Sequence, residues 1–420
     1  MRRIGIWTLA LVLLAGGATP SPAQDKITLT LEKSINLALE QNPFYLASQQ
    51  RVDAAQARMR EAASQFFPSL NAQGLQNLDE KVFVLEFPSL IPGGRPQRVA
   101  IDFTRDYQFS LSLSLPLYTG GRLSSGYRTA KYSYLSSQEA SRQTTQETVF
   151  NVKRGFYGYL LAEQLVKVSA EALDLAAKLL QNVKNMYEVG MASRLDLLRA
   201  EVRVANLKPP LINARNNLAL AELSFKTLLG LDVAQPVEIA GEMTFQPVEI
   251  NLEESIAKAL ANRPELNQLN YQKRMAYEMV KVARADYFPT LAISGNYNFW
   301  ADTFSFKKNT WQNFYAFNLV LSIPIFNGLA TPAKVAESQA AVRELEFTEK
   351  GLVNNVKFEV QAGFLNLNQA KESLLSQEKN VDEALESARI AELNYAEGLV
   401  TILDVAQAQV SVSEARINYL

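Results

Sequence analysis

The side chains that most often do chemistry in proteins are scarce in this sequence. None of its 420 residues is Cys or His, which excludes thiolate and imidazole metal sites, Cys nucleophiles and His-based triads. Carboxylates could still act as a catalytic pair in a cleft. The acidic residues instead lie mostly on helical faces, where a solvated or ion-paired role is the default; examples are Glu383, Glu386 and Glu392. We therefore predict no enzyme activity, no cofactor and no metal site.

Two stretches place an acidic residue shortly after a glycine in the same pattern. They read YEVGMASRLDLL and YAEGLVTILDVA, so that Gly190 corresponds to Gly398 and Asp196 to Asp404. A glycine between helical stretches is expected to reverse the chain. A carboxylate in the first turn of the next helix interacts favourably with the positive end of the helix dipole. A helix cap and a packing contact are therefore the simplest interpretation of these aspartates.

The glycine turns belong to a longer internal duplication. LTLEKSINLALEQNP resembles INLEESIAKALANRP, FFPSL resembles YFPTL, and FSLSLSLPLYTGGR resembles FNLVLSIPIFNGLA. The sequence thus contains two copies of one unit, a first repeat over 29–230 and a second over 252–420, joined by a linker over 231–251. The period is far longer than that of solenoid proteins.

Each repeat predicts the same order of elements. The first is expected to contain a helix over 31–66, strands over about 66–78 and 103–118, a long helix over 123–190, and a returning helix over 193–230. The second is expected to contain strands over about 287–301 and 311–326, a long helix over 330–397, and a returning helix truncated at Leu420. The stretch 123–190 contains no Pro and would extend about 100 Å at 1.5 Å per residue. Pro209 and Pro210 are expected to kink or interrupt the first returning helix.

The N-terminus has the layout of a secretory signal. Two arginines precede an apolar run from Ile4 to Ala15, and small residues and prolines follow. The run is shorter than the roughly 20 residues of a membrane-spanning helix, so we predict a signal peptide over 1–23 rather than an anchor. The remaining sequence lacks a long apolar stretch, so a membrane would have to be entered by strands. The net charge of −1 gives no reason to expect a nucleic-acid partner.

The predicted strands alternate strictly between apolar and polar residues. Phe109, Leu111 and Leu113 alternate with Ser110 and Ser112. This pattern fits a half-buried soluble sheet, but it also fits a membrane barrel with an apolar outside and a polar inside. The long helices lead away from the strands and cannot cover them, which favours the barrel. Four strands cannot close a barrel, and lipid tolerates no open edge; two, three or four chains would supply 8, 12 or 16 strands.

Together these motifs resemble the TolC-like outer-membrane efflux proteins, from about residue 29 to the end of the chain. The resemblance rests on the duplication and on SLSLPLYTGGR, YEVGMASRLDLLRAEV, LINARNNLALAELSFKTLLGL and YAEGLVTILDVAQAQ. It implies an α+β membrane protein that forms a homotrimer, with a twelve-stranded barrel in the outer membrane of a Gram-negative bacterium and an α-helical coiled-coil barrel in the periplasm. The implied function is a passive exit duct that serves efflux or type I secretion. Its implied partners are a periplasmic adaptor, an inner-membrane pump and outer-membrane lipid.

The resemblance also implies roles for individual residues. The extracellular loops would be 79–102 and 302–310. The periplasmic aperture would be formed by Tyr187, Gly190, Asp196, Tyr395, Gly398 and Asp404. Adaptor contacts would be made by Val189, Gly190, Met191, Gly398 and Leu399. The strand-to-helix junctions would be marked by Pro116, Gly120, Gly121, Pro324 and Gly328.

The sequence departs from the family at the aperture. A second Asp normally follows three residues after the position of Asp404, and here that residue is Gln407. Val400 stands where better-known members have a basic residue. At most one acidic ring can therefore be carried over. A periplasmic coiled-coil adaptor, or a structural protein of an export complex, is the alternative function, and the two predicted strand pairs count against it.

Overall fold

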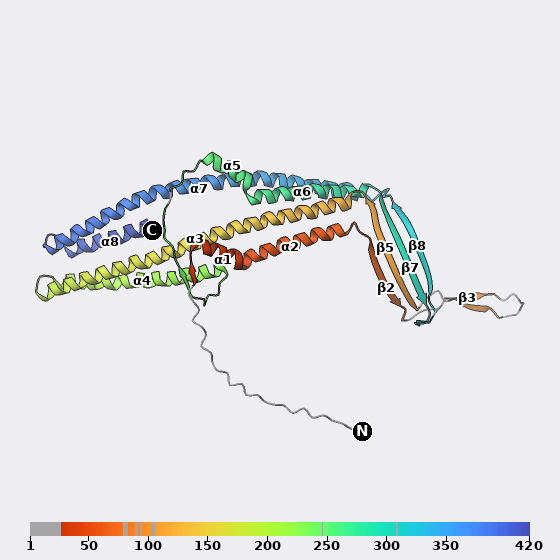
Figure 1. Cartoon of the computed structure of the whole chain (residues 1–420), viewed down its shortest axis with the longest axis horizontal. Helices are drawn as coiled ribbons and strands as arrows, with labels where there is room; N and C mark the ends of the chain where they lie inside the picture. The colour runs from red at the N-terminus through yellow and green to blue at the C-terminus, as the bar shows by residue number, and fades with distance from the viewer. Residues whose placement is uncertain are drawn as a thin grey trace, which may run out of the picture. The chain divides into compact units, whose positions relative to one another are not determined.

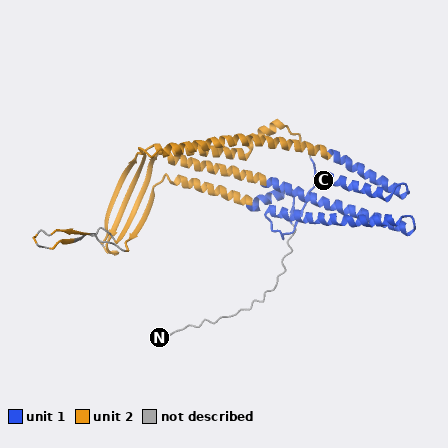
Figure 2. Ribbon diagram, turned by 180° about the vertical axis from the view of Figure 1, so that it is seen from behind, with its two compact units in different colours: residues 1–43, 148–246, 375–420 blue, residues 44–147, 247–374 orange. Residues whose placement is uncertain are grey.

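The structure is a computed structural model that describes residues 27–78, 83–88, 91–92, 95–101, 106–245, 247–307 and 310–420. The predicted signal peptide over 1–23 lies outside these residues. The chain divides into two compact units, each built from both repeats (Figure 2). Unit 1 comprises Met1–Pro43, Thr148–Gln246 and Leu375–Leu420, and unit 2 comprises Phe44–Glu147 and Pro247–Leu374.

Unit 2 contains a four-stranded antiparallel sheet, with two strands from each repeat (Figure 1). Its strands are β2 (Ser69–Gln76), β5 (Tyr107–Thr119), β7 (Thr290–Ala301) and β8 (Gln312–Ser322). The order is β2-β5-β7-β8, so the two repeats meet where β5 pairs with β7. Among the described residues, β2 and β8 each have one paired neighbour, which leaves both edges of the sheet open.

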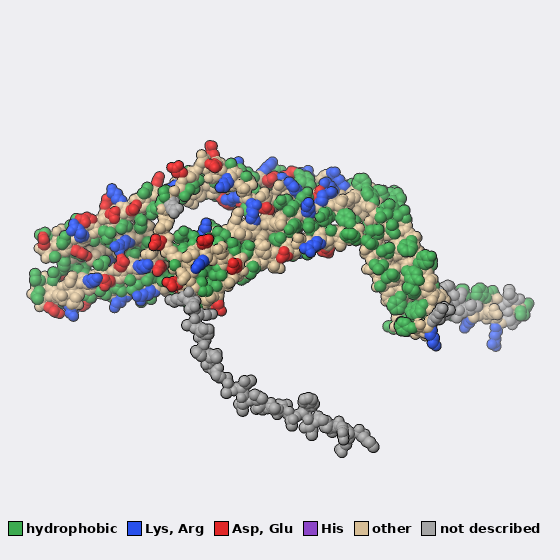
Figure 3. Space-filling view, in the orientation of Figure 1, with side chains coloured by type: hydrophobic (Ala, Val, Ile, Leu, Met, Phe, Trp, Pro, Cys, Tyr) green, Lys and Arg blue, Asp and Glu red, His purple; other side chains and the backbone are tan. Residues whose placement is uncertain are grey.

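The pairing register sorts the strand residues onto two different faces. One face carries Leu111, Leu113, Tyr297, Phe317 and Leu319, and the other carries mainly Ser, Asn and Gln side chains. The apolar side chains of β8 are strongly exposed; Phe317 is 70% exposed and Leu319 is 66% exposed. In Figure 3 hydrophobic side chains cover the strands over most of the visible face. Such an exposed apolar surface needs lipid or another apolar cover.

The strand ends differ from the sequence predictions. We expected Pro116 to close its strand, but β5 continues to Thr119, and its register with β7 shifts between Pro116 and Tyr118. A bulge accommodates the missing N–H of proline inside a strand. The first strand begins at Ser69 rather than near 66, because Phe66 and Phe67 are held in a turn by bonds to Ala63 and Ser64.

The predicted loop over 79–102 contains secondary structure of its own. Strands β3 (Phe83–Phe87) and β4 (Gln97–Ile101) form an antiparallel pair in which Glu86 lies opposite Arg98. Their side chains form an ion pair with an N–O distance of 2.5 Å. The predicted loop between β2 and β5 therefore contains a short hairpin that the sequence did not predict.

The helical segment at the start of each repeat is interrupted at the residue before a proline. The predicted helix over 31–66 is two helices, α1 (Leu31–Gln41) and α2 (Pro43–Ser64). The second repeat has α5 (Leu252–Asn262) and α6 (Pro264–Arg284), followed by a 3₁₀ turn over Ala285–Tyr287. In both repeats the residue before proline is extended, as steric contact with the proline ring requires.

Two ionic clusters bind the helices of unit 2 together below the sheet. Arg128 of α3 (Arg122–Glu188) donates to Glu278 of α6 at 2.9 Å, and Lys281 donates to the same carboxylate at 2.7 Å. Nearby, Asp286 accepts from Arg122 and from Lys334 of α7 (Ala330–Ala396). The side chain of Glu278 is only 7% exposed, so its charge depends on these partners.

The core of unit 1 lies where α1, α3 and α4 (Arg194–Leu229) meet. It contains Leu29, Val152, Phe156, Phe225 and Leu229, all nearly inaccessible to solvent. A short parallel pair, β1 (Ile27–Leu29) and β6 (Val237–Ile239), packs against it, so part of the predicted linker over 231–251 is a strand.

Gly230 ends α4 beside this core, with a φ of 79°. A Cβ at this position would lie 2.5 Å from the carbonyl oxygen of Gln41. Only glycine can therefore occupy this contact without a backbone shift.

Helix α4 is not interrupted at its two prolines, where the sequence predicted a kink or an interruption. Pro209 and Pro210 both lie within Arg194–Leu229, and helix follows them without a break. Leu211, the next residue, is buried, so packing in unit 1 compensates for the two lost backbone hydrogen bonds. The second hairpin of unit 1 is completed by α8 (Ile402–Tyr419). Across the described ranges, no helix combines the length and apolar character that crossing a membrane requires.

Candidate functional site

The two helix turns that carry the predicted aperture residues have the same backbone geometry. In the first, the N–H of Gly190 bonds to the carbonyl of Tyr187 and that of Met191 to the carbonyl of Met186. The second turn repeats both bonds, with Gly398 bonded to Tyr395 and Leu399 to Asn394. This pair of bonds is a Schellman motif, which needs a left-handed residue. Gly190 and Gly398 supply it with φ values of 77° and 75°.

Both predicted aspartates are helix-capping residues. Asp196 accepts hydrogen bonds from the N–H and hydroxyl of Ser193 at 3.2 and 2.6 Å. Asp404 accepts from the N–H and hydroxyl of Thr401 at 2.8 and 2.6 Å. In each case both bonds end on Oδ2. Within one chain, both aspartates therefore act as helix-capping residues, as the simplest interpretation of the sequence predicted.

The charge of Asp404 is fixed by its cap. The bonds from the side chain and backbone of Thr401 hold the pKa of this carboxyl below its ordinary value. Hydrogen bonds to the charged form of a carboxyl stabilise that form. Asp404 is therefore negative at neutral pH.

The two hairpins pack together just behind their turns. Ile402, at the start of α8, is buried with Val183, Leu197 and Ala200 of the first hairpin, and Tyr395 packs against this cluster. We call these five residues the tip cluster. Sequence reasoning identified only Tyr395 among them. The others lie on apolar helical faces, but nothing in the sequence tells which faces of two separate hairpins meet.

Tyr395 also lies near Asp196 of the other hairpin. Burial raises the pKa of the Tyr395 hydroxyl, and the negative charge of Asp196 raises it further. Both residues line a groove of about 500 Å³ between the two turns, together with Met191, Gly398 and Thr401. The structure thus brings together four of the predicted aperture and adaptor residues. Tyr187, Val189, Gly190, Leu399 and Asp404 do not line this groove.

The turns expose apolar side chains to their surroundings. Val189 and Leu399 are each 70% exposed and Met191 is 78% exposed. A second groove of about 510 Å³ lies between α4 and α8 and includes Leu195, Leu198 and Val202. Sequence reasoning missed these three residues, although their spacing of three and four along α4 is typical of a helix face that meets a partner. Gln407, which replaces the second acidic residue, also lines this groove.

The predicted junction residues lie where strands give way to helices, apart from Pro116. Gly120 and Gly121 follow β5 with φ values of 62° and 87°. A Cβ on Gly120 would lie 2.8 Å from both the carbonyl oxygen of Ala285 and Cβ of Phe288. Pro324 and Gly328 lie between the end of β8 and the start of α7. The close contact explains a glycine at position 120, since a larger residue would separate β5 from the 3₁₀ turn.

Comparison with known proteins is consistent across the chain. A family model described as "Outer membrane efflux protein" matches residues 34–231 and 255–420. The probable efflux pump outer membrane protein TtgC of Pseudomonas putida is 24% identical over 92% of this chain and 79% of its own length. The alkaline protease secretion protein AprF of Pseudomonas aeruginosa is 23% identical over 100% of this chain and 87% of its own.

The fold is shared with solved structures as well. The outer membrane protein VceC of Vibrio cholerae superposes with a TM-score of 0.75 at 16% identity, covering 93% of this chain and 91% of that one. The predicted fold class, long helices with four strands per chain in two repeats, is thereby confirmed.

The predicted class of function and location is confirmed at the level of the family. Its members include outer membrane proteins of efflux pumps and a protein of protease secretion. The relatives lie in the outer membrane of Gram-negative bacteria, with their helical part in the periplasm. They are channel proteins rather than enzymes.

Proposed function

Because the chain belongs to the outer membrane efflux protein family, whose model matches most of its length, we propose that it is an exit duct that conducts substrates passively across the outer membrane without catalysing a reaction. Three copies form one channel, with the strands in the membrane and the helix turns at the periplasmic entrance. An adaptor and an inner-membrane pump deliver the substrate to this entrance.

The open-edged sheet is the observation that carries this proposal. Strands β2 and β8 leave backbone groups unpaired along both edges among the described residues. Lipid cannot hydrogen-bond these groups, so a sheet with an apolar outer face must close on itself or on further copies. Three copies supply twelve strands, enough for a barrel with a water-filled bore.

Extraction and conductance together test the duct. The protein should leave outer membranes only with detergent, run as a trimer before heating, and form ion-conducting channels in planar bilayers. A stable monomer that dissolves without detergent would contradict the proposal, because the apolar sheet face would then have no lipid and its edges no partner.

We assign the closed entrance to the two helix turns. The tip cluster supports this assignment, because it packs one hairpin against the other within a chain. Threefold symmetry would bring three Asp404 carboxylates near one axis, where like charges repel one another and attract cations. Release of the contacts between hairpins would widen the entrance, so that adaptor binding shifts the population towards an open state.

The adaptor contact is assigned to the exposed apolar residues of the turns. Val189, Met191 and Leu399 project from the turns with at least 70% of their surface exposed. Exposed apolar side chains gathered at one place are typical of protein interaction sites. The glycines at 190 and 398 hold these side chains outward, since each ends a helix in a left-handed conformation.

A further inference from the structure

The polar face of the sheet has a distinct composition near the end that leads to the loops. In register, Gln73 of β2 lies opposite Ser110 of β5, which lies opposite Asn298 of β7. In the next polar row towards the loops, Gln108 lies opposite Trp300. Amide and hydroxyl groups from three strands therefore lie in the row next to one large aromatic ring.

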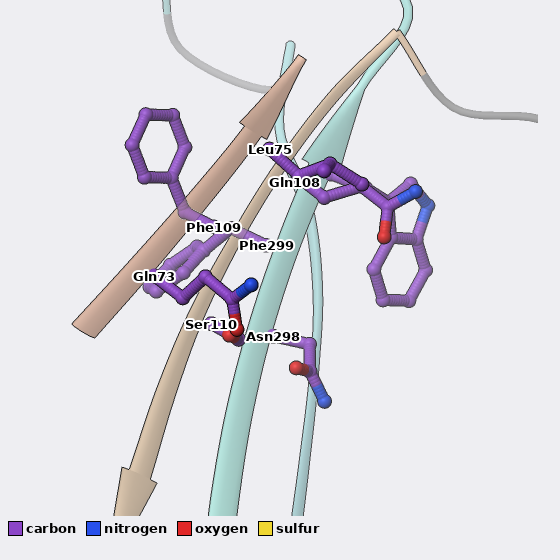
Figure 4. Close-up of a pocket in the computed structure, with 8 residues that line it drawn as sticks. Gln73, Leu75, Gln108, Phe109, Ser110, Asn298 and Phe299 are labelled. Carbon is purple, nitrogen blue, oxygen red and sulfur yellow. The ribbon is translucent and has the colours of Figure 1, made fainter. Parts of the chain in front are cut away.

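These residues enclose a hollow. It has a volume of about 400 Å³ and is lined by Gln73, Leu75, Gln108, Phe109, Ser110, Asn298, Phe299 and Trp300. Figure 4 shows the polar ends of Gln73, Ser110 and Asn298 close together across the strands. A volume of this order suits a small organic molecule.

The aromatic ring in this hollow is held in place. The indole N–H of Trp300 donates to Oε1 of Gln312 on β8 at 2.8 Å. The bond fixes the orientation of the indole beside β8. Within the described part of the chain, the side chains of Gln73, Gln108 and Asn298 make no hydrogen bond to another residue. Their donors and acceptors remain available to water or to a solute.

The described residues that line the hollow carry no charge, and neither do the strands around it. None of the residues in Ser69–Gln76, Tyr107–Thr119, Thr290–Ala301 and Gln312–Ser322 is Asp, Glu, Lys or Arg. A charged solute would lose hydration in this hollow and gain no ion pair. An uncharged aromatic solute would stack on the indole and exchange hydrogen bonds with the amides.

We infer that this hollow is a solute-binding subsite on the inner wall of the duct, and that it takes uncharged aromatic molecules bearing a hydroxyl or amide group. The inference rests on the proposed function, because only the barrel makes the polar face an inner wall. Trp300 is the platform, and Gln73, Gln108, Ser110 and Asn298 supply the hydrogen bonds. Molecules of this class would pause at the subsite before release.

Tryptophan fluorescence tests the subsite directly. The chain has three Trp residues. Trp7 lies in the predicted signal peptide, and Trp311 packs at a tilt against Phe109, with ring centroids 5.5 Å apart. In purified trimers of the Trp311→Phe variant, the signal therefore comes from Trp300. The probes are 4-nitrobenzyl alcohol, which is neutral, and 4-nitrobenzoate, which is its charged counterpart.

We expect the neutral probe to quench Trp300 along a saturable curve, and the charged probe to bind at least fivefold more weakly. Asn298→Leu and Gln73→Leu, each added to Trp311→Phe, should weaken saturable binding at least tenfold. Asn318→Leu is the matched control, because Asn318 lies on the same polar face opposite Ser294, outside the hollow. It should leave binding unchanged.

Linear, unsaturable quenching that is equal in the Asn298→Leu and Asn318→Leu variants would overturn the subsite. Conductance of the same preparations in planar bilayers separates this failure from failure of the duct. Normal channels with linear quenching would remove the subsite and retain the duct. Saturable quenching without channels would retain the hollow as a binding site and remove the duct, and with it the inference that the site lies on a channel wall.

Discussion

The hydroxyl of Thr401 donates a 2.6 Å hydrogen bond to Oδ2 of Asp404 at the start of the second returning helix. Ser193 and Asp196 repeat this bond at 2.6 Å in the first repeat. The chain therefore has two helix caps with the same geometry. Only the cap at Asp404 lies at the position where the outer membrane efflux proteins have an acidic ring. Comparison of the two separates the effect of charge at the aperture from the effect of a lost cap.

Asp404→Asn should reduce the preference of the channel for cations. Asparagine retains an oxygen that can accept from Thr401, so the cap survives while three charges leave the trimer. The reversal potential in a KCl gradient should move towards the value of a nonselective pore. Asp196→Asn is the matched control and should move it less. An unchanged reversal potential in Asp404→Asn would place this carboxylate away from the ion path.

Tyr395→Phe combined with Asp404→Ala should raise single-channel conductance. The double substitution removes the Tyr395 hydroxyl from the groove between the turns and the proposed ring of charge from the entrance, so the closed entrance loses a polar group and an electrostatic barrier. Tyr187→Phe provides the comparison, because Tyr187 is the first-repeat counterpart and does not line the groove between the turns. Equal conductance of the double variant and the unmodified channel in planar bilayers would remove both residues from the gate.

Cation selectivity should persist in acid and disappear only below the ordinary pKa of aspartate, about 3.9. Thr401 holds the pKa of Asp404 below that value, so the charge is fully present above it and is lost as pH falls through the lowered value. A titration of reversal potential against pH measures this directly. Loss of selectivity at or above pH 5 would point to a different ionisable group.

Glu278→Gln should destabilise the helical part by about 1–3 kcal/mol, because a nearly buried charged hydrogen-bond acceptor is lost. Arg128 and Lys281 would then face a neutral amide. Thermal unfolding followed by helical circular dichroism gives the change. Glu386→Gln removes a comparable pair with Arg389 on an exposed surface and should have no measurable effect.

Acid should weaken the same cluster. Burial alone would raise the pKa of Glu278, but hydrogen bonds from Lys281, Arg128 and Ser125 outweigh it and hold the pKa below its ordinary value. The stabilisation is therefore present above the ordinary value for glutamate and declines as pH falls through the lowered one. If Glu278→Gln lost as much stability as the unmodified protein on acidification, the carboxylate would not be the source of this decline.

Phe317→Lys should prevent stable trimers, whereas Asn318→Lys should allow them. The two residues are neighbours on β8 but lie on opposite faces of the sheet. A lysine on the lipid face costs about 2–4 kcal/mol near the middle of the membrane, whereas the polar face meets water. Heat-resistant trimer yield on gels distinguishes the two. The reverse result would mean that the polar face meets lipid, and it would contradict the proposed barrel with an apolar outer face.

The repeat and the strand alternation could be predicted because both are local patterns. The alternating residues around Phe109 and Phe317 do occupy one face of the sheet. Proline was less reliable, because its effect depends on packing. Pro43 interrupts the helix that the sequence predicted as continuous over 31–66, while Pro209 and Pro210 lie within one.

The tip cluster could not have been predicted from the pattern of either hairpin. Ile402 is buried because it meets Val183 and Leu197, which lie far away in the sequence. The pair β1 and β6 escaped notice for a similar reason: three residues give no periodic signal, and their pairing depends on the core of unit 1. The sequence patterns predicted the turn residues. The packing around them depends on which helix faces of the two hairpins meet, and no local pattern indicates this.

The uncharged strands have a consequence for how the duct meets its surroundings. A wall of serine, asparagine, glutamine and aromatic side chains gains and loses no protons between acid and mildly alkaline conditions. The stretch of wall that these four strands form therefore keeps one electrical character whether the medium outside is acidic or neutral. Any acid response of conduction must then come from ionisable groups outside the strands, and a cell in a changing environment would export past a wall that external acidity does not reset.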